Sequence, residues 1–180
     1  MTRRVTTAHT ALAVILGYTT AAWAQSSAVP DVPETLKSAP AEHLVLVAHA
    51  SGTQIYLCGR GADGQAQWTL KGPDAELRDD KGRVIGHHSI GPSWKYSDGS
   101  EVTGKGAARV DAPDPAAVPW LRLSAVSHTG SGLLAKVTTI QRLHTKGGQP
   151  PPASQCDPAK PSTEVKVPYT ADYYFYAPAS

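Results

Sequence analysis

Apolar and polar residues alternate in short runs along the chain from about residue 42 onward. The first such runs are 43–49 (HLVLVAH) and 53–58 (TQIYLC), and these and later runs contain many β-branched and aromatic residues. This period of two is typical of half-buried β-strands. The same criteria predict further strands at 67–70, 75–79, 84–90, 93–97, 101–110, 119–127, 133–145 and 170–176. Mixed periodicity at 117–127 and 133–144 leaves a helix as the alternative there.

Turn residues separate these runs and leave few windows for a helix. The 16 glycines and 15 prolines are scattered along the chain. Asp63-Gly64, Asp80-Lys81-Gly82 and Asp98-Gly99 recur about every 17 to 18 residues. Such pairs suit tight hairpin turns, because glycine accepts a positive φ at little steric cost. We therefore predict one all-β domain over 42–178, folded as an antiparallel sandwich or a closed barrel.

The N-terminus has the features of an export signal. Arg3 and Arg4 precede an apolar run at 11–17, and Ala22-Trp23-Ala24 has the small-x-small pattern of a cleavage site. We predict a signal peptide at 1–24 and a flexible Ser-, Ala- and Pro-containing lead-in at 25–41. No later segment approaches the roughly 18 apolar residues that a membrane helix needs. The expected location is therefore periplasmic or extracellular, with no membrane span.

Export changes the interpretation of the two cysteines, Cys58 and Cys156. An oxidising compartment favours a disulfide between them. A redox or nucleophilic thiol is the alternative, but the chain has no Cys-x-x-Cys pair and no obvious activating neighbour. We predict one disulfide that ties the C-terminal third of the chain to the early strands.

Gly59, Gly61 and Gly64 form a G-x-G-x-x-G motif directly after a predicted strand. A dinucleotide-binding loop needs a helix after these glycines, because the helix N-terminus holds the pyrophosphate. Here Gly72-Pro73 would stop any helix within two turns. The motif is therefore predicted to be a hairpin turn, an NAD-dependent dehydrogenase is disfavoured, and no cofactor is expected.

The charge balance gives no sign of a polyanionic partner. The chain has 17 Lys and Arg residues and 15 Asp and Glu residues, so loss of Arg3 and Arg4 with the leader leaves 15 of each. Nucleic acids and anionic membranes require a clustered positive face. Since no run of Lys or Arg stands out, no nucleic-acid partner is expected.

Local motifs for metal binding or hydrolysis are also missing. The sequence has no H-E-x-x-H, no H-x-H and no G-x-S-x-G. His87 and His88 are adjacent, so in a strand they point to opposite faces and cannot share one ion. No metal site is predicted, although a site assembled from distant segments, such as His88 with Asp98, stays open.

The densest group of functional residue types lies at 86–104, GHHSIGPSWKYSDGSEVTG. Aromatic rings beside polar groups can form a platform for a ligand. The alternative is that Trp94 fills the core and the Gly-Pro turn positions it. With two polar residues from a later strand, the ligand-binding candidates are His88, Trp94, Tyr96, Asp98, Gln141 and Arg142.

Several motifs in one order resemble domain-of-unknown-function family 3455, over about 32–176. They are Val32-Pro33, Gln54-Ile55-Tyr56, Cys58, Gly86, His88, Gly91-Pro92, Trp94, Asp98-Gly99-Ser100, Pro119-Trp120-Leu121, Val137-Thr138, Ile140-Gln141-Arg142, Thr145, Gly147-Gly148, Cys156, Val167-Pro168-Tyr169, Tyr173 and Phe175. The resemblance implies a secreted protein without an assigned activity. Some fungal relatives are labelled malate dehydrogenase, which the glycine motif of this chain does not support.

Three functions follow as hypotheses. The first is a non-catalytic binding module for a small molecule, a glycan or an envelope component. The second is a secreted hydrolase or metal-assisted enzyme that uses His88 and Asp98, with Arg142 as a further group. The third is a structural envelope protein. They differ in whether the candidate residues face one cavity or scatter through core and turns.

Overall fold

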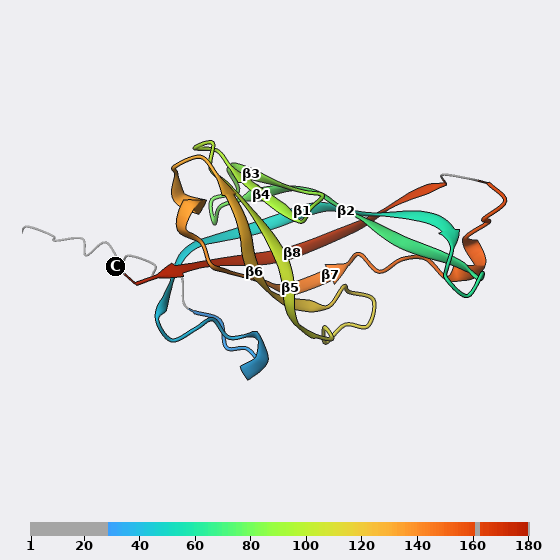
Figure 1. Ribbon diagram of the computed structural model, residues 1–180, viewed down its shortest axis with the longest axis horizontal. Coiled ribbons are helices and arrows are strands. Elements are labelled where there is room, and N and C mark those ends of the chain that lie inside the picture. Colours follow the sequence, from blue (N-terminus) through green and yellow to red (C-terminus); the bar gives the residue numbers. More distant parts are fainter. Residues whose placement is uncertain (1–28, 161–162, 180) are drawn as a thin grey trace, which may run out of the picture.

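The protein folds as a closed antiparallel β-barrel of eight strands. A computed structural model describes residues 29–160 and 163–179, so the predicted signal peptide lies outside the described residues. Each strand pairs with its neighbour in the sequence, and β8 closes the barrel on β1 (Figure 1). The all-β prediction is confirmed, and of its two alternatives the barrel is the one that forms. Among the described residues, no helix is long and apolar enough to cross a membrane.

The strands differ widely in length, and three short 3-10 helices lie outside the sheet. The elements are β1 (Glu42–Arg60), β2 (Ala66–Arg78), β3 (Val84–Ser89), β4 (Ser93–Tyr96), β5 (Glu101–Val110), β6 (Trp120–Thr129), β7 (Thr139–Gly147) and β8 (Glu164–Pro178), with η1 (Glu34–Leu36), η2 (Leu133–Lys136) and η3 (Ala153–Gln155).

Two strands run through places where the sequence predicts breaks. β1 is continuous across 51–52, and β2 is continuous across Gly72-Pro73. At Gly72 the pairing with β1 shifts register, so the glycine and proline sit at a β-bulge and not in a turn. Gly72 has a φ of 148°, and a Cβ there would lie 2.8 Å from the Ile90 side chain. The bulge bends the strand without ending it.

The G-x-G-x-x-G motif forms the hairpin between β1 and β2. Arg60 pairs with Ala66, and the Gly64 amide donates to the Gly61 carbonyl at 2.9 Å. Gly64, Gly82 and Gly99 have φ values of 76°, 76° and 89°. The hairpin prediction is therefore confirmed, and no helix follows the motif to hold a phosphate.

The segment predicted as a strand at 133–145 divides into two elements. Residues 133–136 form η2, and only 139–147 form the strand β7. Leu134 is fully buried and belongs to the barrel core. A single helical turn places this leucine over the end of the barrel, so the strand prediction is wrong for the first part of the segment.

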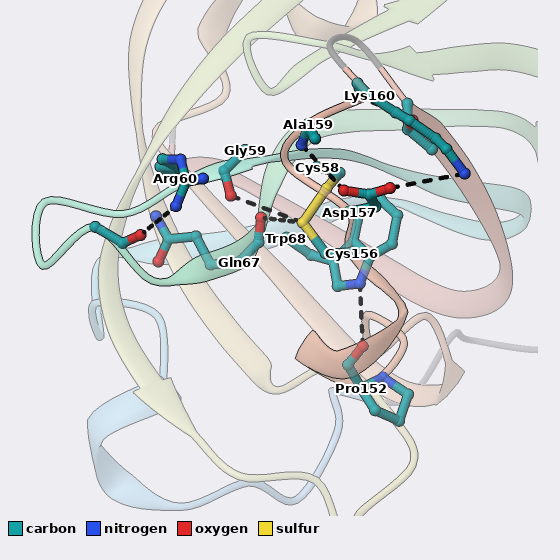
Figure 2. Close-up of a disulfide and its surroundings, with 12 residues drawn as sticks. Cys58, Gly59, Arg60, Gln67, Trp68, Pro152, Cys156, Asp157, Ala159 and Lys160 are labelled. Atoms are coloured by element: carbon teal, nitrogen blue, oxygen red, sulfur yellow. Dashed lines mark hydrogen bonds and ion pairs between the residues drawn. A yellow bond between two sulfur atoms is a disulfide. The ribbon is translucent and has the colours of Figure 1, made fainter.

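The hairpin ends of β1 and β2 extend beyond the barrel with the start of β8 as a three-stranded arm (Figure 1). The predicted disulfide between Cys58 and Cys156 is confirmed, and it attaches the segment around η3 to this arm (Figure 2). Trp68, which pairs with Cys58 across the arm, donates its indole N–H to the Pro152 carbonyl at 3.3 Å.

Alternation along β8 separates an inner core from an outer one. Tyr169, Ala171, Tyr173 and Phe175 point into the barrel, while Tyr174 and Tyr176 point outward. The outward pair packs with Leu36 of η1, with Val32 just before η1, and with Leu143 of β7. Thus the part of the predicted lead-in that the structure describes, 29–41, covers one outer face of the barrel.

Candidate ligand-binding cavity

A cavity of about 390 Å³ lies inside the barrel. Small-molecule sites in proteins commonly have volumes of roughly 300–1,000 Å³, so this one can hold a small organic molecule. Leu70 and Ile90 are 50% and 51% exposed and lie at its rim. Its lining residues come from seven strands and one turn: Gln54, Leu70, Lys71, Gly72, Pro73, His88, Ile90, Gly91, Pro92, Trp94, Leu121, Leu123, Arg142 and Tyr173.

Three aromatic rings form one wall of the cavity. His88 on β3 pairs with Trp94 on β4, and cross-strand neighbours share a face of the sheet. Their rings stack with centroids 4.5 Å apart and an angle of 4° between planes. Tyr173 from β8 meets both rings edge-on, at 4.9 and 5.4 Å. All three side chains are buried.

His88 is held as a neutral ring with a defined tautomer. Its Nδ1 lies 2.7 Å from the Ser93 carbonyl oxygen, which can only accept, so Nδ1 carries the proton and Nε2 is an acceptor. Burial lowers the pKa of His88 to about 3, although the bond to Ser93 acts in the opposite direction. At neutral pH the histidine therefore contributes an acceptor and an aromatic face, and no charge.

Arg142 places a positive charge at the cavity wall. It pairs with Leu121 on β6 and Tyr173 on β8, and it is only partly exposed. Its Nε and Nη2 donate to the Pro119 carbonyl at 3.2 and 2.8 Å. No acidic side chain of the described residues forms an ion pair with it. The guanidinium is thus oriented by a neutral group and lacks a counter-charge.

Four buried donors near this arginine make no hydrogen bond of ordinary geometry within the part of the chain that the structure describes. They are Gln54 Nε2, Trp94 Nε1 and the hydroxyls of Tyr169 and Tyr173. The Tyr173 hydroxyl nevertheless lies beside Tyr169 and Arg142, and contacts with both oppose the rise in its pKa that burial causes. Burial raises the pKa of both tyrosines, and the charge of Arg142 opposes the rise at each. An unpaired buried donor costs about 1–3 kcal/mol. Polar groups in this state are expected where a ligand or water completes the bonds.

The structure divides the six predicted ligand-binding residues into two groups. His88, Trp94 and Arg142 line the cavity. Tyr96 packs at the edge of the core. Asp98 accepts bonds from Ser100 and from the Leu133 amide, which connects the β4–β5 turn to η2.

Gln141 lies on the outer face of β7. Its Nε2 donates to the Leu36 carbonyl at 2.7 Å, and its Oε1 accepts from the Tyr176 hydroxyl at 2.9 Å. Neighbours in a strand point to opposite faces, so Gln141 holds η1 on the outside while Arg142 reaches the inside.

Sequence reasoning missed three polar residues near the cavity, Gln54, Tyr169 and Tyr173. The alternation of residues 169, 171, 173 and 175 along β8 could have predicted that the two tyrosines face the interior. No pattern in the sequence indicates the same for Gln54. Its side chain reaches this interior only because β1 pairs with both β2 and β8.

A second polar cluster lies on the outside of the barrel. Asp172 accepts from His49 at 2.7 Å and from His144 at 2.9 Å, and His49 also bonds Asp80 at 2.9 Å. The bonds to Asp80 and Asp172 raise the pKa of His49. Over residues 29–160 and 163–179, no group of three or more His, Cys, Asp or Glu side chains is placed to hold a metal ion.

Comparison with known proteins gives a family and no activity. No curated protein matches the chain, and no solved structure does. The family model described as "Protein of unknown function (DUF3455)" matches residues 39–177. This range includes seven strands in full, β8 up to Ala177, both cysteines and the residues of the cavity. The chain therefore belongs to the DUF3455 family.

Proposed function

We propose that this protein is an exported, non-catalytic binding module that holds a small molecule in the barrel cavity. The observation that carries the proposal is the joint presence of apolar walls and unpartnered buried donors around one space. Apolar burial contributes about 25 cal/mol per Å², which supplies affinity, and a few placed polar groups fix orientation. Leu121, Leu123 and the His88–Trp94 stack supply the apolar contact.

The state of His88 favours binding over hydrolysis. A histidine that acts as a general base accepts a proton from the reacting group, and in catalytic triads an acidic side chain orients it and stabilises its charged form. Among the described residues, His88 bonds only the Ser93 carbonyl, while Asp98 is engaged with Ser100 and Leu133. The two residues of the enzyme hypothesis thus have separate structural partners.

The disulfide supports export. Bridges of this kind persist in oxidising compartments and are rare in the cytosol. Together with the predicted signal peptide, the Cys58–Cys156 bond favours a periplasmic or extracellular site of action.

The neutral fluorescent probe N-phenyl-1-naphthylamine tests the cavity directly. We expect its fluorescence to rise on binding, and the amide NMR signals of Leu121, Leu123 and Tyr173 to shift. Leu121→Trp, which fills the cavity, is expected to weaken binding by about tenfold or more, or about 1.4 kcal/mol. Val126→Trp adds the same indole on the exposed side of β6 and serves as the control, since Val126 is 58% exposed.

Two results would contradict the proposal. One is an unchanged fluorescence spectrum in a protein that circular dichroism shows to be folded. The other is probe binding with NMR shifts confined to residues outside the cavity. The NMR arm keeps the test valid even if Leu121→Trp does not fold.

A further inference from the structure

We propose that the ligand is an organic acid, and that its carboxylate pairs with Arg142 while its apolar body lies between the His88–Trp94 stack and the leucines of β6. This inference rests on the proposed function, because it names the class of molecule that the same cavity binds. The new element is the charge of the ligand, which no sequence motif of the chain indicates.

The first step is the missing counter-charge of Arg142. A partly buried cation is unfavourable unless an anion or well-placed acceptors compensate it. Pro119 supplies one carbonyl oxygen, which occupies Nε and Nη2 and brings no negative charge. Nη1 makes no hydrogen bond of ordinary geometry to any described residue, and the Tyr173 hydroxyl that lies beside the guanidinium is neutral. Guanidinium N–H groups match the two oxygens of a carboxylate, so this free edge is suited to an anionic head group.

The second step is the character of the surrounding polar groups. Among the described residues, Gln54 and Trp94 each present a buried donor without a partner, and the Tyr173 hydroxyl beside Arg142 makes no hydrogen bond of ordinary geometry. The nearby His88 is neutral and adds no competing charge to Arg142. An anion is able to accept from donors of this kind, whereas a cationic ligand would meet the arginine as a like charge. The donor set therefore favours a negatively charged group over an amine.

The third step is the apolar part of the cavity wall. An inorganic anion has no apolar surface to place against it, so this wall favours an organic anion. Leu121, Leu123 and Pro92 line the cavity, and Leu70 and Ile90 are at the rim. Lys71 at the same rim is paired with Glu164 at 2.8 Å, so its charge is already compensated. Each methylene of a ligand that is buried against these apolar side chains adds to the affinity. A carboxylate with a hydrocarbon body thus gains from both parts of the site.

Octanoate and 1-octanol form a matched pair for the test, since they share a chain and differ in charge at pH 7. Each displaces N-phenyl-1-naphthylamine from the protein in a fluorescence titration, with inorganic phosphate as a third competitor. We expect octanoate to compete at least tenfold better than octanol, and phosphate to compete far more weakly than octanoate.

Arg142→Gln is expected to remove this preference, weakening octanoate by about 10- to 100-fold and leaving octanol within twofold of the wild type. Arg142→Lys keeps the charge and is expected to retain part of the preference. Arg83→Gln is the control, because it removes the same charge from an exposed residue that is paired with Asp79 in the hairpin between β2 and β3. It should leave both competitors unchanged.

The outcomes separate this inference from the proposed function. Equal competition by octanoate and octanol, or a preference that survives in Arg142→Gln, overturns the organic-acid inference while probe binding still supports the cavity. Phosphate competing as well as octanoate overturns the organic part of the inference. If the probe does not bind and neither competitor raises the melting temperature, both proposals fail.

Discussion

At the scale of single residues, His88 links the cavity to the stability of the barrel. Its folded pKa of about 3 lies well below the ordinary value of 6.5 because the ring is buried. As pH falls, the unfolded chain takes up a proton that the folded protein excludes. The contribution of His88 to stability is therefore complete above about pH 6.5 and is lost between pH 6.5 and about 3.

We predict that His88→Phe removes this pH dependence. For one group the slope is about 1.4 kcal/mol per pH unit below the unfolded pKa, so the free energy of unfolding of the wild type should fall relative to that of the variant as pH falls from 7 to 4. Urea titrations at each pH give these values. His87→Phe, on the exposed neighbour, should keep the wild-type slope. Parallel curves for wild type and His88→Phe would show that the buried ring is not the source.

Neighbouring residues show which part of the site could be predicted from the sequence. The rule that strand neighbours face opposite ways correctly separates exposed His87 from buried His88. Applied to Gln141 and Arg142, the same rule already indicates that both cannot serve one cavity. What the rule does not give is which of the two faces inward, because that depends on η1 covering the outer face of β7.

At the scale of elements, Asp98 acts as a connector between the β4–β5 turn and η2. Its carboxylate accepts from the Ser100 amide, the Ser100 hydroxyl and the Leu133 amide at 2.6–2.8 Å. These bonds lower the pKa of Asp98, with the Ser100 hydroxyl as the largest cause. A Cβ on Gly132 would lie 2.1 Å from Asp98 Oδ2, so only glycine leaves room for this contact.

We predict that Asp98→Ala lowers the urea midpoint and speeds amide exchange at Leu133 and Leu134, while binding of N-phenyl-1-naphthylamine is unchanged. Gly132→Ala should have the same effect by displacing the carboxylate. Asp63→Ala is the matched control, since among the described residues Asp63 accepts only from the Gln65 amide within its own hairpin turn. A loss of probe binding in folded Asp98→Ala would return Asp98 to the list of ligand-binding residues.

Element boundaries were the least predictable part of the fold. The period of two locates nearly every strand. It predicts a break at Gly72-Pro73, whereas the structure has a bulge there, inside β2. A bulge and a turn use the same residue types, because both need unusual backbone angles or lack an N–H donor. The choice between them is made by the partner strand, and β1 is continuous opposite this point.

At the scale of the whole molecule, the cavity depends on barrel closure. Gln54 on β1 and Tyr173 on β8 come together because the first and last strands pair along most of their length. Arg142 joins them through the pairing of β7 with β8. Such contacts link residues far apart in the sequence, so period and motif cannot place them. For this reason the sequence predicts the fold class, but only three of its six candidate residues, His88, Trp94 and Arg142, line the cavity.

The disulfide stabilises the arm, and the barrel should keep its cavity without it. Cys58 and Cys156 are 98 residues apart. Chain-entropy models give about 4–5 kcal/mol for a loop of this order, and measured effects are often smaller. We predict that the Cys58→Ser, Cys156→Ser double variant loses about 2–4 kcal/mol of stability in urea titrations. Reduction of the wild type should lower its midpoint to that of the variant.

Probe binding distinguishes the arm from the barrel in the same variant. Gln54 lies four residues before Cys58, but it is held by its own pairing with Val167 of β8 and Pro73 of β2. Under conditions where the variant is still folded, N-phenyl-1-naphthylamine should therefore bind within about twofold of the wild type. A folded variant that no longer binds the probe would mean that the arm shapes the cavity. The bridge would then belong to the binding site as well as to the stability of the fold.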